Sequence, residues 1–152
     1  MATRNDFVIA REGGVVLNHQ TAAAGSTPTT WDAIGCPKGT WTFGRQVAEV
    51  DDNLDNWCIT QSAAIESFSP GAMSLDVSGS MELILDDTAY TNMLAAIDAS
   101  SYNWLQADMT DVDAVNNDQV TYGGYLTQFN HQFQGTGPSD IAVAFRGNEI
   151  GV

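Results

Sequence analysis

The chain has 152 residues, which is the size of one domain large enough to bury a core without disulfides or metal ions. Its 19 acidic and 5 basic residues give a formal net charge of −14, and the stretch from Gln46 to Phe145 contains neither Lys nor Arg. Because a protein that holds nucleic acid as cargo needs cations to neutralise phosphates, this composition excludes such a role.

Targeting and redox signals are weak in this sequence. No run of 18 apolar residues occurs, and residues 1–14 lack the apolar centre of a signal peptide. We therefore expect a protein made and used in a cytoplasm. Cys36 and Cys58 follow no metal-ligand or redox spacing, so we predict two free, buried thiols without a chemical role.

The first 50 residues predict short strands separated by loops. Residues 7–10 and 14–17 are apolar and flank a turn around Gly13, which favours two short strands. Residues 19–30 are small and polar, so we expect a surface loop with an exposed His19 at its start. Residues 31–50 are apolar again, with Gly and Pro between them, which indicates two more strands.

The segment from Asp51 to Pro70 is predicted to be a long projecting loop. It contains a turn-like cluster of Asp51, Asp52 and Asp55, has no helical or strand period, and ends at Ser69-Pro70-Gly71. Connections of about 20 residues are uncommon in compact domains and are often functional.

The following segment contains the one expected helix. Residues 72–85 alternate between apolar and small polar side chains, which predicts paired strands or one bent strand. Asp86 or Asp87 is a candidate N-cap, and Ser100-Ser101 ends the helical pattern. The apolar residues of the helix recur at i, i+3, i+4 and i+7, namely Tyr90, Met93, Leu94 and Ile97.

Three strands are expected in the remainder: residues 102–109, a long strand over residues 119–133, and residues 141–145, with an acidic turn at residues 110–119. The long strand would extend roughly 50 Å, well beyond an average strand. Its buried face is predicted to switch at Gly123-Gly124, because the apolar residues before and after this pair have opposite parity: Val120 and Tyr122 before it, and Tyr125, Phe129, His131 and Phe133 after it. The other face after the switch is polar and uncharged, with Leu126, Gln128, Asn130, Gln132 and Gln134.

The groups that catalysis requires are scarce. His19 and His131 are the only imidazoles, and His131 lies between Phe129 and Phe133, which favours a histidine of a core or an interface. The acidic turn resembles a calcium loop, but Val115 breaks the alternation of oxygen ligands. The tryptophans are spread over separate elements, as core residues usually are. We expect no enzyme, no cofactor and no metal site, which leaves a binding or structural role.

Five stretches taken in order resemble the tail tube (major tail) proteins of long-tailed bacteriophages. They are TWDAIGC, DDNLDNW, SFSPGAMSLDVSG, ILDDTAYTNMLAAI and YGGYLTQFNHQFQGTGPSDIAVAFRGN, which together cover about residues 30–149. The resemblance implies a single domain over residues 1–152, mostly β: a β-sandwich or partial barrel with one packed helix. It also implies that strands join a shared inner barrel in hexameric rings, and that the rings stack around an acidic channel for DNA. Residues 1–30 match no pattern of the family.

The resemblance further implies sites, partners and a location. The projecting loop takes the place of the loop that reaches the next ring, with Asp51, Asp52, Asp55, Trp57 and Phe68 as candidates. Candidate channel-facing residues are Gln128, Asn130, Gln132, Asp108, Asp111 and Asp113. Expected partners are further copies of the chain, a tape measure protein, a tail terminator and distal tail or baseplate proteins, with DNA passing unbound and no membrane. The expected location is the virion tail, assembled in the host cytoplasm.

Two other functions stay open at this stage. A monomeric β-sandwich adhesion module would use the tryptophans to stack on sugars and the aspartates to hold calcium. A small hydrolase would use an acid pair such as Asp51 and Asp55, although no motif supports it. The absence of a visible signal peptide counts against the exported adhesion module.

Overall fold

The computed structural model describes residues 2–51 and 68–152. The strands form one seven-stranded antiparallel sheet in the order β2-β1-β5-β6-β7-β4-β3. The elements in chain order are η1 (Arg4–Asp6), η2 (Ala10–Glu12), β1 (Val15–Thr21), β2 (Asp32–Ala33), β3 (Pro37–Asp51), β4 (Phe68–Glu82), α1 (Thr88–Asp98), β5 (Asn103–Thr110), β6 (Asn117–Gln132) and β7 (Asp140–Ile150). The predicted class, mostly β with one packed helix, is confirmed. None of the described helices is long and apolar enough to cross a membrane.

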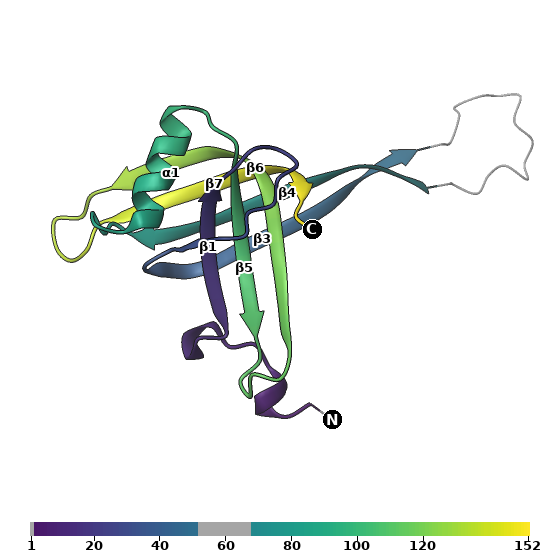
Figure 1. Ribbon diagram of the computed structural model, residues 1–152, viewed down its shortest axis with the longest axis horizontal. Helices are drawn as coiled ribbons and strands as arrows, with labels where there is room; N and C mark the ends of the chain where they lie inside the picture. The colour runs from purple at the N-terminus through teal and green to yellow at the C-terminus, as the bar shows by residue number, and fades with distance from the viewer. Residues whose placement is uncertain (1, 52–67) are drawn as a thin grey trace, which may run out of the picture.

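The sheet has two halves that share the long strand β6. Residues 117–124 of β6 pair with β5, which pairs in turn with β1 and, beyond it, β2. Residues 125–132 of β6 pair with β7, which continues to β4 and β3. We call the second group, β3, β4, β7 and residues 125–132 of β6, the four-strand half. The strands of the two halves run in different directions (Figure 1), so the sheet curls into a partial barrel that is not closed.

Two irregularities in the pairing of β6 with β7 lie where β6 passes from one half to the other. The pairing of β6 with β7 shifts between Gly123 and Gly124, and again between Leu126 and Gln128. A Cβ on Gly124 would lie 2.1 Å from the carbonyl oxygen of Arg146, and one on Gly123 would lie 2.8 Å from the Trp104 ring. Only glycine fits where β6 passes this close to its neighbours.

The predicted switch of the buried face is real, but its position was wrong. Leu126, which we assigned to the polar face, is buried, whereas Tyr125 and Phe133 are 42% and 77% exposed. The change of parity follows the second irregularity, after which Phe129 becomes the buried residue. One extra residue in a strand reverses every side chain beyond it, and Thr127 has the position of that extra residue.

Helix α1 packs against β1, β2 and β6 on the core side of the sheet. Asp87 caps it by accepting a hydrogen bond from the Ala89 amide at 3.2 Å, as one of the two predicted N-caps. Met93 is fully buried in the core, and the Tyr90 hydroxyl lies 2.9 Å from Nε2 of His131. His131 is therefore a core-edge histidine with a partner, as its apolar neighbours predicted.

His19 is buried, contrary to the prediction of an exposed loop residue. Strand β1 continues to Thr21, and His19 pairs with Leu105 of β5 on the same face as Leu17. Its side chain is fully buried, and neither ring nitrogen has a hydrogen-bond partner among the described residues. Burial lowers its pKa from 6.5 to about 4, although Asn103 and Asp32 act in the opposite direction.

The N-terminal segment forms two 3₁₀ turns where residues 7–10 were predicted to be a strand. Phe7 and Val8 are 55% and 47% exposed, so this apolar run joins neither sheet nor core. The segment bonds to the turn between β5 and β6 instead, where the Val112 amide donates to the Phe7 carbonyl at 3.2 Å. Strand conformation is stabilised by packing against neighbouring strands, so an apolar run without a partner strand need not adopt it.

Four further predictions need correction or completion. Residues 72–85 belong largely to one strand, β4, and the last strand continues to Ile150 rather than ending at Phe145. The ends of the predicted loop are strand, because Asp51 pairs with Phe68. Cys36 is half-buried rather than buried, and Cys58 lies outside the described residues.

Candidate assembly surfaces

One face of the four-strand half is uncovered, and its side chains are small and polar. Directly paired residues of antiparallel strands point to the same side, so the pairing defines rows across the face. We call this surface, which lies opposite helix α1, the open face. Its two central rows are Gln128, Ala144, Ser78 and Thr42, and Asn130, Ala142, Ser80 and Lys38. The predicted residues Gln128, Asn130 and Gln132 all lie here and are exposed.

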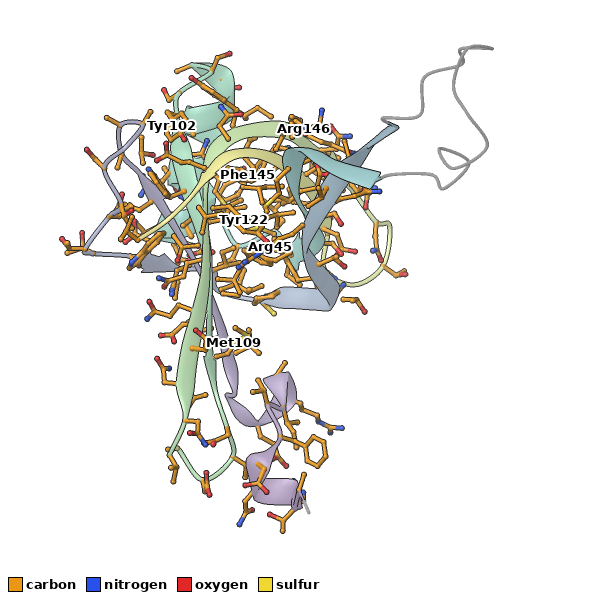
Figure 2. All side chains as sticks on the ribbon, turned by 90° about the vertical axis from the view of Figure 1, so that its right-hand side faces the viewer. Arg45, Tyr102, Met109, Tyr122, Phe145 and Arg146 are labelled. Carbon is orange, nitrogen blue, oxygen red and sulfur yellow. The ribbon has the colours of Figure 1, made fainter. Side chains whose placement is uncertain are left out.

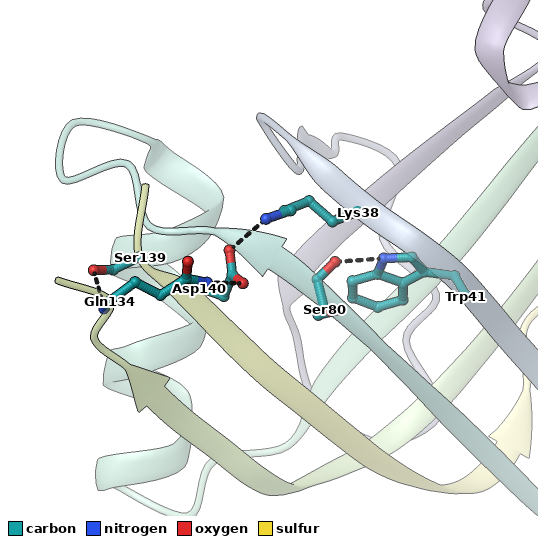
Figure 3. A network of polar contacts seen from close by, with 6 residues as sticks. All are labelled: Lys38, Trp41, Ser80, Gln134, Ser139 and Asp140. Carbon is teal, nitrogen blue, oxygen red and sulfur yellow. Dashed lines mark hydrogen bonds and ion pairs between the residues drawn. The ribbon is translucent and has the colours of Figure 1, made fainter. Parts of the chain in front are cut away.

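Both described cations of the open face lie in ion pairs. Lys38 Nζ lies 2.7 Å from Oδ1 of Asp140, and Arg146 Nε lies 3.3 Å from Oδ1 of Asp76. The hydrogen bond from Lys38 to Asp140 raises the pKa of the lysine, with a smaller contribution from Glu82, so the ammonium stays charged. Figure 3 shows this group, in which Gln134 also donates to Asp140 while Trp41 donates to the Ser80 carbonyl.

Both lateral edges of the four-strand half are open. Strand β3 pairs only with β4, and residues 125–132 of β6 pair only with β7, because β5 begins opposite Gly124. Each edge presents unpaired backbone N–H and C=O groups within the part of the chain that the structure describes. Such edges template the addition of another strand unless they are covered.

Strands β3 and β4 extend beyond β7 as a two-stranded arm. The pairing of β4 with β7 ends at Leu75, whereas β3 and β4 stay paired to Asp51 and Phe68 (Figure 1). Val47 and Met73 face each other in this arm and are 40% and 51% exposed. Of the candidates in the predicted loop, Asp52, Asp55 and Trp57 lie outside the described residues, as do the side chains of Asp51 and Phe68.

An arginine and two aromatic rings pack together at the base of the arm, where the two halves of the sheet meet the core. Arg45 Nε donates to the Tyr122 hydroxyl at 3.0 Å, and its guanidinium carbon lies 5.7 Å from the centre of that ring. The Phe43 ring packs on Tyr122 at 5.7 Å. Figure 2 shows Arg45 and Tyr122 close to Phe145 in the middle of the molecule. These contacts attach β3, at the base of the arm, to strand β6.

Solved structures of tail components have the same arrangement of strands and helix. A chain from the tail of an empty gene transfer agent particle, refined with C6 symmetry, superposes with a TM-score of 0.66 at 12% identity, over 90% of this chain and 92% of that one. The SPP1 tail tube superposes with a TM-score of 0.65 at 13% identity, over 90% of this chain and 74% of that one. The chain has a tail-tube fold. A chain of the native gene transfer agent virion agrees, with a TM-score of 0.67 at 10% identity over 92% and 97%.

The structural similarity is not accompanied by a detectable similarity of sequence. No protein-family model matches the chain, and no curated protein matches it. With identities near one residue in eight, the likeness establishes the fold, and the role of the chain in an assembly is argued separately below.

The three remaining channel candidates lie in the other half of this tail-tube fold. Asp108 is near the end of β5, and Asp111 and Asp113 are in the turn before β6, so the structure does not bring them together with Gln128, Asn130 and Gln132. Asp111 is buried and organises its turn, since its carboxylate accepts hydrogen bonds from the Val115 amide at 2.8 Å and from Asn116. These bonds hold its pKa below the usual value even though burial acts to raise it. Asp113 is exposed.

The open edges and paired charges were not visible in the sequence. No pattern in β3 marks it as the last strand of the sheet, and Lys38 is far from Asp140 along the chain. One signal was available for the open face: the row of uncharged Gln and Asn residues at alternate positions in β6. Among the described residues, no group of three or more His, Cys, Asp or Glu side chains is placed to hold a metal ion.

Proposed function

We propose that the chain is the structural subunit of a tail tube, in which hexameric rings stack around a channel for DNA. The observation that carries this proposal is the four-strand half, with an open edge on each side and an uncovered polar face between them. The likeness to the SPP1 tail tube supports the role, and the C6 symmetry of the similar gene transfer agent tail supports six subunits in a ring.

Ring closure follows from the two edges. The free edge of β3 in one subunit lies beside residues 125–132 of β6 in the next, so that each four-strand half extends its neighbour's sheet. Such a head-to-tail contact uses two different surfaces and satisfies every edge only when the ring closes. Closure into a barrel also removes the exposed edges that would otherwise aggregate.

The open face is the inner wall of this barrel. Helix α1 lies against the other side of the sheet, so it belongs to the outside of the tube. The described charged residues of the face are Lys38 and Arg146 against Asp76, Glu82 and Asp140, which leaves one net negative charge per subunit. The wall is therefore far less acidic than the whole chain, and a wall made of the open face does not include Asp108, Asp111 or Asp113.

The arm provides the contact between rings. It leaves the body beyond β7, and its exposed Val47 and Met73 provide apolar surface for a neighbour. In this arrangement residues 1–152 act as one tail tube domain, and the segment between β3 and β4 reaches the next ring. Other tail proteins, namely a tape measure protein, a terminator and distal tail or baseplate proteins, complete the structure at its ends and inside it. A chain of the tube terminating cap of the anti-feeding prophage has a related fold, with a TM-score of 0.56 at 8% identity.

Mass measurement in solution and negative-stain electron microscopy of the purified chain test this proposal. Rings or tubes of uniform width with six-fold symmetry are expected. A chain that stays monomeric at high concentration after prolonged incubation contradicts it. Stabilisation of such a monomer by calcium or by sugars would favour the adhesion module instead.

A further inference from the structure

The open face has two described cations, and each lies beside a carboxylate. Both ion pairs connect strands: Lys38 of β3 reaches Asp140 of β7 at 2.7 Å (Figure 3), and Arg146 of β7 reaches Asp76 of β4 at 3.3 Å. The Arg146 and Asp76 side chains are 66% and 53% exposed. An ion pair as exposed as this one contributes about 0–1 kcal/mol to stability, so stability alone gives little reason for placing Arg146 and Asp76 on the open face.

We propose that Asp76 and Asp140 keep the two cations of the open face from binding DNA phosphates. This inference rests on the proposed function, in which the open face lines a channel for DNA. Non-specific DNA binding depends on cations that neutralise phosphates and release counterions, and its affinity grows with the number of contacts. A cation that already has a carboxylate partner gains less from a phosphate, because the phosphate must compete with that partner.

Symmetry multiplies the effect of each ion pair. In a six-subunit ring, two uncompensated cations per subunit would give about 12 per ring, and stacked rings would repeat them along the whole channel. DNA moving past such a wall would exchange phosphate contacts continuously and be held back. With the cations paired, the wall offers mainly hydroxyl, amide and methyl groups, which neutralise no phosphate.

The two pairs are not equivalent. Lys38 has a second acid nearby, because Glu82 also raises its pKa, so the lysine stays partly compensated without Asp140. Asp76 is the acid that the structure places on Arg146. Loss of Asp76 therefore exposes a full positive charge, and we expect it to cause the larger effect.

The test compares tubes of three proteins: the natural chain, the double variant Asp76→Asn/Asp140→Asn, and the control Asp86→Asn/Asp98→Asn. Both variants remove two negative charges, but Asp86 and Asp98 are exposed at the two ends of helix α1, away from the open face. Each preparation is incubated with a short fluorescent DNA duplex, and the DNA that sediments with the tubes is measured. At about 50 mM salt the first variant should retain at least about tenfold more DNA than the other two, and the excess should disappear near 200 mM.

Two additional variants keep the result decisive. If the double variant does not assemble, Asp76→Asn alone takes its place, since this exposed pair contributes little to folding. Adding Arg146→Gln to Asp76→Asn should return DNA retention to the natural level. Equal retention by the open-face variant and the helix control, in tubes of normal appearance, overturns the inference while leaving the tube proposal intact. Absence of rings or tubes from the natural chain overturns the proposed function itself.

Discussion

Gly124 and His19 are single positions on which the packing of the two halves depends. Gly124 lies where β6 leaves one half and enters the other, against the backbone of β7. His19 lies beneath helix α1 among buried residues, with unpartnered ring nitrogens. Neither residue has an exposed side chain, so both affect the assembly only through the fold of the subunit.

Replacement of Gly124 by Ala should destabilise the subunit by at least about 2 kcal/mol. The new Cβ would lie 2.1 Å from the Arg146 carbonyl oxygen, and that atom is backbone, so the strands must separate locally. Urea denaturation measures the loss. Gly135→Ala is the control, because a Cβ there meets nothing within 4 Å. Equal urea midpoints for Gly124→Ala and Gly135→Ala would show that β6 and β7 can move apart at this crossing without a loss of stability.

The buried His19 should make the subunit sensitive to mild acid. Burial lowers the pKa of the folded imidazole to about 4, whereas an unfolded imidazole titrates near 6.5. Between these values the unfolded chain takes up a proton and the folded chain does not, so stability is complete above pH 6.5 and falls as the pH decreases toward 4. The difference corresponds to about 3 kcal/mol.

Denaturation curves collected from pH 7.5 to pH 5 check this prediction. His19→Gln should reduce the slope of stability against pH in this range, whatever its effect on absolute stability. His131→Gln is the matched control, since His131 is only half-buried and bonded to Tyr90. A slope that persists in His19→Gln would assign the acid sensitivity to other groups.

At the scale of the elements, the arm formed by β3 and β4 is the part whose role is separable from folding. Beyond Leu75 it pairs with no other described strand, and Val47 and Met73 do not belong to the core. A two-stranded ribbon that leaves the body in this way contributes little to the stability of the subunit.

Val47→Ser/Met73→Ser should therefore leave the subunit folded and impair the stacking of rings. We expect a change in unfolding free energy within about 0.5 kcal/mol, as is usual for exposed positions. Thermal melting and the length of tubes in electron micrographs are measured in parallel. Val16→Ser/Val115→Ser, which changes exposed apolar residues outside the arm, should form tubes of normal length. Loss of the fold in the arm variant would instead place these residues in the core.

The elements differ in how far the sequence could predict them. Helix α1 has a clear period and one buried face, and both α1 and strand β5 lie within two residues of their predicted bounds, although residues 103–107 of β5 are buried on both faces. In β6 the alternation of Gln128, Asn130 and Gln132 indicated the polar face, but the extra residue at Thr127 leaves no trace in composition. An apolar run such as residues 7–10 is predicted to be a strand from its composition alone, because the sequence does not show whether a neighbouring strand is available for it to pair with. For the same reason the open edges and the ion pairs, which depend on which strands become neighbours, required the structure.

The charge of the whole molecule opposes its own assembly. In the proposed hexameric ring, six copies at −14 each would give about −84, and neighbouring rings would repel one another in the same way. The open face is nearly neutral by comparison, so most of the repulsion comes from acids on the rest of the subunit. Repulsion between such surface charges acts through solvent and is screened by salt, with a Debye length of about 30 Å at 0.01 M and about 8 Å at 0.15 M.

Ring and tube formation should therefore be favoured by salt over this range. At fixed protein concentration, sedimentation velocity should show a growing fraction of large species as salt increases from about 0.01 to 0.15 M. The variant Asp86→Asn/Asp98→Asn, which carries two fewer negative charges per subunit, should reach the same fraction at lower salt. The strand pairing proposed between β3 of one subunit and β6 of the next is uncharged, so added ions should not weaken it. Dissociation of rings by salt would show instead that ion pairs between subunits outweigh the repulsion, and that strand addition is not the main contact that closes the ring.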